Sequence, residues 1–310
     1  MSVIISGLLS GGLYATIGLG LALVFGVMRL VNLAHGEFIV LGAYAASLFI
    51  TWLGVDPFVS LIIVVPLMAL VTYPLQRFLL TGLLRKGLES PLVATFGLSL
   101  VITAVLTALF GGDARSLNAP YASAGIDLLG TRVRVIDVVG LLIGVVLVVG
   151  THLLMSRSRW GAALRAASAD PITAGTMGIN VNVVYALTFA ASAAIAAVGG
   201  VLVGVAYSFS PTAGSNYMLI GFTVVVLGGT GSVLGVLWGG LALGVVQSVG
   251  SAVFGGQYRD FVIYAAFIII LALKPAIDTA RDRGLFARKR YTPGASAATP
   301  QTTSTAVPTS

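Results

Sequence analysis

The chain has no cysteine and very little charge. None of its 310 residues is cysteine, which excludes disulfides, thiolate metal sites and cysteine nucleophiles. Charged residues make up only 9% of the sequence, whereas a typical soluble domain carries about 25%. Hydrophobic residues make up 57%, and the mean hydropathy is +1.03. Because so few charges cannot cover a surface that faces water, we expect an integral, multi-pass membrane protein.

The apolar runs predict an all-α, polytopic bundle of about eight or nine membrane spans. They are far longer than the roughly 10-residue alternating segments of an outer-membrane barrel. They lie at 3–28, 37–55, 58–76, 90–110, 136–155, 183–207, 217–229, 233–254 and 260–279. The first run is too long for a signal peptide and is expected to remain as a span, tilted or broken near Gly11-Gly12. The short run 217–229 is either a half-span or one arm of a hairpin with 233–254.

The basic residues orient the bundle with its N-terminus outside and its C-terminus inside, following the positive-inside rule. The inner side then receives Arg29, Arg77, Arg85, Lys86, Arg157, Arg159, Arg165, Lys274, Arg281, Arg283, Arg288, Lys289 and Arg290. Only Arg115, Arg132, Arg134 and Arg259 fall outside. Since these residues flank apolar runs, the net charge of +7 does not indicate nucleic acid binding.

Two patterns suggest internal packing. The segments "FIVLGAYAAS" and "FTVVVLGGTGS" have similar composition and opposite predicted directions, which fits an inverted repeat. Small residues four apart let helix backbones approach closely in lipid. Such pairs are Gly7/Gly11, Gly200/Gly204, Gly235/Gly239 and Gly240/Gly244.

Composition divides the chain into a transmembrane domain, 1–285, and a tail, 286–310. The tail is basic at first and then rich in Ser, Thr, Pro and Ala, so we expect it to be disordered and cytoplasmic. The segment 111–135 is the one sizeable external connection.

No enzymatic constellation is visible. The glycine-rich stretch "LGGTGSVLG" lacks the lysine of a phosphate-binding loop, because the only lysines are Lys86, Lys274 and Lys289. Asp113, Asp127 and Asp137 do not have the spacing of metal ligands, and His35 and His152 are separated by several spans. We therefore expect no nucleotide, metal or catalytic site in this chain.

The turn "NLAHGE" places Asn32, His35 and Glu37 at the predicted inner edge of a span. His35 and Glu37 are two residues apart, so on a helix they would point in different directions. They are either hydrated interface residues or the mark of a pathway or gate. Asn32 could cap the following helix.

The predicted cytoplasmic segment, about 156–182, has the pattern of a helix, a turn and a short second helix. "WGAALRAAS" is rich in helix formers. Asp170 and Pro171 suit the N-cap and first position of the second helix, and Gly178 suits its end. The segment is either a plain connector or a docking element for a cytoplasmic partner.

Three blocks carry a family resemblance. They are "GGLYATIGLGLALVFGVMRLVNLAHGEFIVLGAYAA", "WGAALRAASADPITAGTMGINVNVVYALTFAASAAIAAVGGVLVG" and "GFTVVVLGGTGSVLGVLWGGLALGVVQ". In this order they resemble the H-type permease subunit of bacterial ABC importers for branched-chain amino acids, related to ribose-type permeases. The resemblance covers roughly residues 6–280.

The resemblance implies a set of partners in the bacterial inner membrane. These are a second homologous permease, two cytoplasmic ATPase subunits that bind ATP and Mg²⁺, and a periplasmic or lipid-anchored substrate-binding protein. Membrane lipid surrounds the spans, and this chain holds no cofactor itself.

The resemblance also implies roles for individual residues. Within the segment 161–179, which couples the ATPases to the spans, it matches Arg165, Asp170, Ala174, Gly178 and Ile179. It makes Asn32, His35, Gly36 and Glu37 a signature turn that shapes the inner pathway or the permease–permease interface. Hydroxyl side chains within the spans would line the pathway or bond to their own helix backbone: Tyr14, Thr16, Tyr44, Ser47, Thr95, Ser99, Thr103 and Thr223.

Three alternatives stay open at this point. The same machinery could carry urea or short amides. A stand-alone secondary transporter would need an ionisable group within the membrane; away from the span edges the sequence offers none. A membrane enzyme is disfavoured by the missing catalytic constellation.

Overall fold

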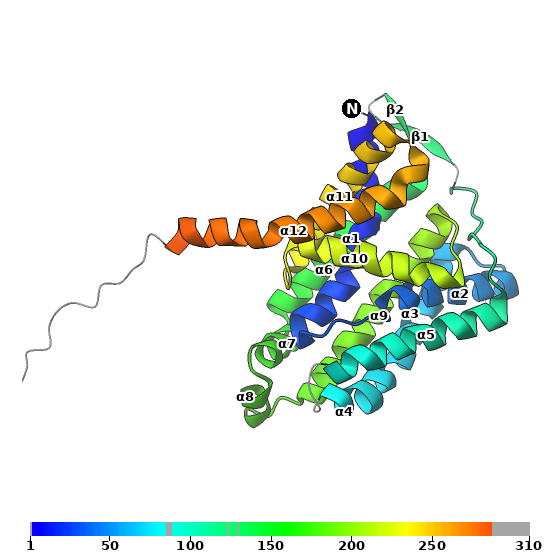
Figure 1. The fold of residues 1–310 in the computed structure, drawn as a ribbon. Coiled ribbons are helices and arrows are strands. Elements are labelled where there is room, and N and C mark those ends of the chain that lie inside the picture. Colours follow the sequence, from blue (N-terminus) through cyan, green and yellow to red (C-terminus); the bar gives the residue numbers. More distant parts are fainter. Residues whose placement is uncertain (1, 85–88, 123, 129, 287–310) are drawn as a thin grey trace, which may run out of the picture. The chain divides into compact units, whose positions relative to one another are not determined.

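The computed structural model describes residues 2–84, 89–122, 124–128 and 130–286 (Figure 1). Its helices up to residue 157 are α1 (Ser2–Met28), α2 (His35–Leu53), α3 (Pro57–Pro74), the π-helix η1 (Leu75–Leu80), α4 (Thr81–Leu84), α5 (Glu89–Phe110) and α6 (Val135–Arg157). The later helices are α7 (Arg159–Ala169), α8 (Pro171–Thr176), α9 (Val181–Ala206), η2 (Pro211–Ala213), α10 (Gly214–Gly228), α11 (Val233–Phe254), η3 (Gly256–Tyr258) and α12 (Arg259–Phe286).

The chain divides into two units, one ending at Leu271 and the other starting at Ala272. In the second unit the structure describes only the end of α12, up to Phe286. The predicted disordered tail, 287–310, lies outside the described residues, as do Arg85 and Lys86.

The predicted polytopic helical bundle is confirmed. Within the described residues, 8 helices are long and apolar enough to cross a membrane. The short run 217–229 lies in α10, which has only 15 residues and packs against α11, as expected for a half-span in a hairpin.

The first helix is continuous, so the predicted break near Gly11-Gly12 is wrong. Instead of breaking the helix, these glycines allow close contacts with other helices. A Cβ added to Gly11 would lie 2.6 Å from the Cα of Leu241 in α11, and one added to Gly12 would clash with Leu141 in α6. Glycine therefore serves packing here rather than flexibility.

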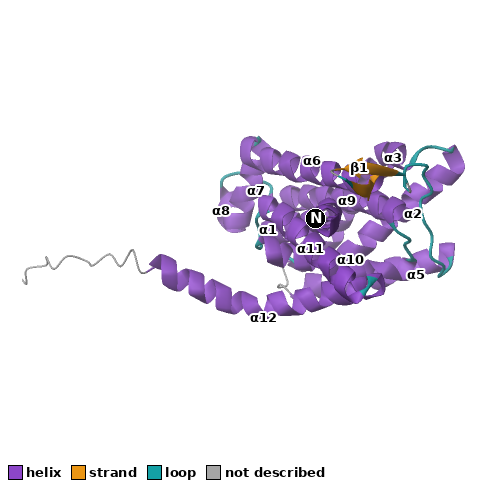
Figure 2. Cartoon of the chain, turned by 90° about the horizontal axis from the view of Figure 1, so that it is seen from above, coloured by secondary structure: helices purple, strands orange, loops and turns teal. Residues whose placement is uncertain are grey.

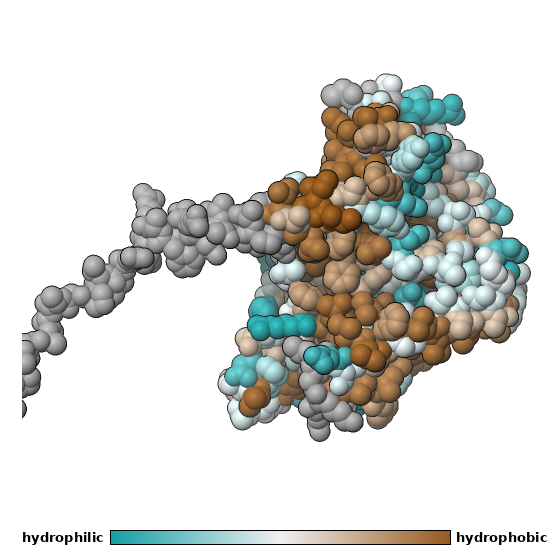
Figure 3. Space-filling model, viewed as in Figure 1, coloured by the Kyte–Doolittle hydropathy of each residue, from teal (hydrophilic) through white to brown (hydrophobic). Residues whose placement is uncertain are grey.

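Buried and lipid-exposed helices are clearly separated. In α1 and α9, 83% and 78% of the most apolar window is buried, against 22% in the α3 span and 17% in α5 and α6. Figure 2 shows α1 near α9 and α11, with α3 and α5 farther out. Hydrophobic residues cover much of the face that Figure 3 shows. Those more than two-thirds exposed on α3, η1, α5 and α6 include Ile62, Leu70, Phe78, Leu109 and Val146, as expected for contact with lipid.

The helix contacts repeat in the two halves of the first unit. The helix α1 packs on α10 and α11, while α9 packs on α2 and α3. The helices α1 and α9 run antiparallel, because Gly20 faces Ser192 whereas Gly199 faces Thr16 and Ile17. This is the arrangement of an inverted repeat. The two similar sequence segments lie on the corresponding helices α2 and α10, but their alignment is shifted. Aligning the segments pairs Phe38 with Phe222, whereas aligning the first residues of the two helices pairs Phe38 with Tyr217.

Three of the four predicted small-residue pairs make close contacts between helices, and in the fourth only Gly200 does. Gly7 and Gly11 in α1 face Gly240 and Gly244 in α11, where added Cβ atoms would meet the opposite backbone. The pair Gly235/Gly239 faces α10, while Gly200 faces α2 and Gly204 faces Leu117 and Phe209.

The connection between α5 and α6 contains the short hairpin β1 (Gly125–Leu128) and β2 (Thr131–Arg134), with Ile126 opposite Val133. Before the hairpin, the Tyr121 hydroxyl donates to both carboxylate oxygens of Asp56 at 2.8 Å. Asp56 is the N-cap of α3 and accepts from the Phe58 amide. The connection is therefore tied to the start of α3.

Candidate functional site

The signature turn begins with a sharp reversal after α1. Arg29 has a φ of +51° and is the one non-glycine residue in the described ranges with a positive φ. Asn32 does not cap α2 as predicted. Its Oδ1 accepts the Ala34 amide at 3.1 Å, and the N-cap is Ala34, whose side chain has no oxygen. Asn32 therefore stabilises the turn before the helix, because its short side chain reaches only the amide two residues ahead.

The turn carries His35 to the middle of the bundle. The His35 Nε2–H donates to the Ile17 carbonyl oxygen at 3.0 Å, and its ring lies against Gly20. The Ser192 hydroxyl donates to the Gly20 carbonyl oxygen at 2.8 Å, so α9 contacts α1 beside the His35 ring. His35 is 0% exposed. The predictions of an inner-edge position and a hydrated side chain are therefore wrong for His35.

Chain length explains this depth. The residues from Ile17 to Met28 climb about 16 Å along α1, and the short segment 29–34 then folds back by the same distance. A hydropathy profile places the turn at the edge of the membrane, because it detects the interruption of the apolar run but not the direction in which the chain continues.

Glu37 points away from His35, as predicted, toward the N-terminus of α10. A Cβ added to Gly214, the first residue of α10, would lie 2.7 Å from Glu37 Oε1. A Cβ added to Gly36 would clash with the Gly214 carbonyl oxygen. Glu37 is 6% exposed. The N-termini of α2 and α10 thus meet inside the protein with one carboxylate beside both, a favourable position for a negative charge.

Four of the eight predicted pathway hydroxyls bond to their own helices. Thr16 donates to Gly12, Ser47 to Tyr44, Thr95 to Leu92 and Thr223 to Leu219, at 2.8 to 3.1 Å. Thr95 also accepts the Leu33 amide at 3.2 Å, which ties α5 to the turn. Tyr44 packs between the rings of Phe110 and Phe209, Ser99 is buried, and Thr103 is half-buried. None of the predicted hydroxyls lines the cavity beside Arg165 or the cavity beside Arg259. A pathway role for them therefore stays a prediction.

Tyr14 belongs to a polar cluster that the sequence did not reveal. The Arg259 Nη2–H donates to the Tyr14 hydroxyl at 2.7 Å, and Tyr14 donates to Gln247 Oε1 at 3.3 Å. The Arg259 guanidinium also lies 4.0 Å from the centre of the Tyr207 ring, a cation–π contact. From the sequence, Arg259 is assigned only to the outer side of the membrane, among the external basic residues. The available clue was a lone arginine directly before the last apolar run.

The predicted helix–turn–short helix is confirmed by α7 and α8. Asp170 caps α8, with Oδ1 accepting the amides of Ile172 and Thr173 at 2.9 and 3.2 Å. Hydrogen bonds from the Thr173 hydroxyl and amide hold the pKa of Asp170 below its ordinary value. Gly178 has a φ of +85° and lies just past the end of α8. Ala174 is buried, and the Ile179 amide donates to its carbonyl oxygen at 3.1 Å.

Two exposed apolar side chains on this segment were not predicted. Ile172 is 80% exposed and Met177 is 77% exposed, although neighbouring Ala174 is buried. Ala174 in the short helix thus faces inward, whereas Ile172 in its first turn and Met177 just past its end face outward. The sequence signal was present in "DPITAGTMG", where the two large apolar residues stand on either side of Ala174.

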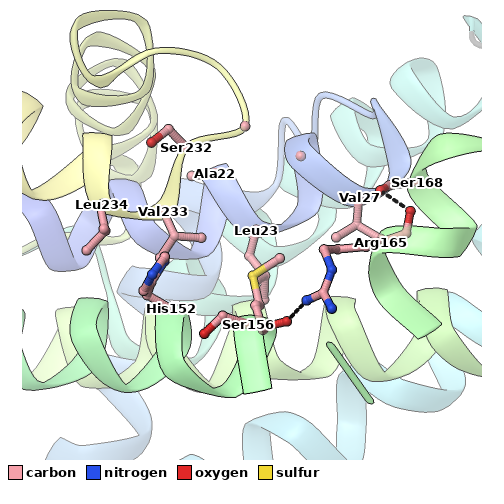
Figure 4. A pocket seen from close by; sticks show the side chains of 13 residues that line it. Ala22, Leu23, Val27, His152, Ser156, Arg165, Ser168, Ser232, Val233 and Leu234 are labelled. Atoms are coloured by element: carbon pink, nitrogen blue, oxygen red, sulfur yellow. Dashed lines mark hydrogen bonds between the residues drawn. The ribbon is translucent and has the colours of Figure 1, made fainter. Parts of the chain in front are cut away.

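Arg165 is an exposed residue of α7, next to the buried Leu164. Its guanidinium donates to the Met155 carbonyl oxygen at the end of α6. It lines a cavity of about 540 Å³ with His152, Ser156, Ser168 and Ser232 (Figure 4). Residues of α1, α6, α7 and the start of α11 surround this space.

The sequence matches one family model over residues 3–271, described as the permease component of branched-chain amino acid transport systems. The chain belongs to this family. It is similar to the high-affinity branched-chain amino acid transport permease BraD of Pseudomonas aeruginosa, with 34% identity over 88% of this chain and 93% of the relative.

The chain is also similar to two other permeases. The LivH permease of the Escherichia coli branched-chain amino acid system is 29% identical over 87% of this chain and 92% of its own length. The fructose import permease FrcC of Rhizobium meliloti is 28% identical over 80% of this chain and 70% of its own length. No solved structure matches the chain significantly.

Proposed function

We propose that this chain is a membrane subunit of a bacterial ABC importer that moves branched-chain amino acids across the inner membrane. The family match over residues 3–271 carries this proposal. The bundle supplies the spans, and ATP and Mg²⁺ bind to separate ATPase subunits.

The segment α7–α8 is the proposed ATPase docking site. Ile172 and Met177 offer exposed apolar side chains on a helix that is firmly capped by Asp170. Apolar anchors surrounded by polar residues are typical of protein interfaces. Arg165 ties α7 to the end of α6, so a push on α8 would reach a membrane span through α7.

The remaining partners follow from the same proposal. A second, homologous permease completes the pathway, and a periplasmic or lipid-anchored binding protein delivers the substrate from outside. The proposed orientation, with α7–α8 in the cytoplasm, rests on the excess of basic residues on that side.

The test is a pull-down of the tagged chain from its native membrane in a mild detergent, with co-purifying chains identified by mass. We expect an ATPase and a second permease of similar size. Repeated recovery of the folded chain alone would contradict the proposal and favour a stand-alone transporter.

Docking is tested in the same experiment with the variants Ile172→Ser and Met177→Ser. Both should lower the yield of ATPase while leaving the second permease bound. Ala169→Ser, on the same segment, is the control and should change neither yield. Equal ATPase recovery from all variants would place the docking site elsewhere.

The related alternative is that the importer carries urea or short amides. It is separated from the main proposal by offering leucine, urea and acetamide to the reconstituted complex. Uptake of urea or acetamide without leucine would support the alternative.

A further inference from the structure

The Arg259 cluster, formed by Arg259, Tyr14, Gln247 and Tyr207, borders a cavity of about 370 Å³. The cavity lies between the end of α9, the start of α10 and the start of α12. Its polar lining includes Tyr207, Asn216, Tyr217, Gln257, Arg259 and Asp260. Apolar side chains of Ile220 and Ile263 complete it. Its volume falls in the range of about 300–1,000 Å³ that is usual for small-molecule sites.

Arg259 has no carboxylate partner in the described part of the chain, where the one side-chain ion pair is Arg134–Asp137. Its Nη2–H donates to the neutral Tyr14 hydroxyl, and its Nε is buried without a hydrogen-bond partner. A partly buried guanidinium without an anion is costly. A bound anion would remove that cost.

The start of α10 forms one wall of the cavity. Ala213, its N-cap, and Asn216, in its first turn, both line it. The Glu37 carboxylate already lies at this helix end, so the preference of the cavity for an anion rests on Arg259.

A negative charge also lines the cavity. Asp260 is exposed and lines the same cavity, but it forms no ion pair with Arg259. The cavity thus offers a guanidinium, a separate carboxylate and an apolar wall. This set of groups suits the carboxylate, the ammonium and the aliphatic side chain of one α-amino acid.

We propose that this cavity binds the amino acid during import, with Arg259 holding its carboxylate and Asp260 facing its ammonium. The assignment rests on the proposed function, which supplies the class of cargo. The cavity is thus a binding site for amino acids on the transport pathway within this chain, and it adds to the selection made by the binding protein.

The test uses the complete complex in proteoliposomes and measures ATP-dependent uptake of labelled leucine. Arg259→Gln should lower uptake about tenfold or more, because the charged contact is lost. Arg132→Gln, an exposed external arginine, should leave uptake unchanged. Wild-type uptake by Arg259→Gln would overturn the proposal.

Two further variants separate binding from structural support. Tyr14→Phe removes a partner of Arg259 but keeps the guanidinium, so it should lower uptake much less than Arg259→Gln. Arg259→Lys keeps the charge and should retain part of the activity. If Tyr14→Phe is as damaging as Arg259→Gln, the cluster is structural and the proposal is wrong.

Thermal unfolding of the complex without its binding protein gives a direct readout. Leucine and 4-methylvalerate, which share the carboxylate, should raise the wild-type Tm, and isopentylamine should not. Arg259→Gln should abolish the shift. No shift in the wild type would contradict the site even if leucine is imported, whereas a wild type that imports no leucine would refute the proposed function and the cargo assignment with it.

Discussion

The His35 imidazole donates to the carbonyl oxygen of Ile17 at 3.0 Å, half-way along α1. The contact fixes the start of α2 against the two most buried helices, α1 and α9. Since the ring is fully buried, its position depends on the absence of a side chain at Gly20.

Gly20→Ala should therefore destabilise the permease. The added Cβ would lie 2.6 Å from His35 Cε1 and 2.8 Å from the Ser192 carbonyl oxygen. Overpacking of this kind costs about 1–3 kcal/mol, which thermal unfolding in detergent measures. Gly97→Ala, on an open face of α5, is the matched control and should be neutral or stabilising. Equal Tm values for both variants would contradict this packing.

Gly36→Ala should separate the N-termini of α2 and α10. Its Cβ would clash with the Gly214 carbonyl oxygen, and backbone atoms cannot rotate away as a flexible side chain can. We expect reduced transport and a lower Tm. Gly150→Ala, where no atom lies within 4 Å of the added Cβ, should retain both. Normal transport by Gly36→Ala would show that this junction tolerates displacement.

Gly178→Val should impair coupling. At a φ of +85° a β-branched residue is strained, at a cost of about 1–2 kcal/mol, and relief of that strain would move the end of α8. We expect loss of substrate-stimulated ATPase activity in the complex with normal amounts of protein in the membrane. Gly175→Ala, inside α8 with open space around it, should keep the stimulation. Full stimulation in Gly178→Val would remove the coupling role.

Tyr121→Phe should loosen the connection between α5 and α6. The hydroxyl donates to Asp56, so its removal should cost about 1–2 kcal/mol in unfolding free energy at pH 7. Burial and the bond to Asp56 raise the Tyr121 pKa, so the hydroxyl is held protonated in the folded state. The wild-type advantage should then be constant below pH 10 and decrease above it. An advantage that grows above pH 10 would contradict this contact.

The sequence predicts the fold well where hydrophobicity and local geometry decide the structure. The spans follow apolar run length, and the cap at Asp170 and the stop at Gly178 follow from short-range backbone rules. Both features involve residues close together in the chain.

The depth of the turn within the bundle and the contacts between residues far apart in the chain could not be predicted in this way. The turn at Asn32–His35 looks like an edge, because an interrupted apolar run does not record how far the chain folds back. Arg259 meets Tyr14 across 245 positions, which no local pattern encodes. Two similar segments suggested an inverted repeat, but only the helix boundaries in the structure give its register.

The most direct test of the central claim is leucine uptake by proteoliposomes that contain this chain, its partner permease and the ATPase subunits, supplied with the binding protein. The account predicts uptake that requires ATP on the ATPase side and persists when proton and sodium gradients are dissipated. Uptake by this chain alone, driven by such a gradient and independent of ATP, would contradict it.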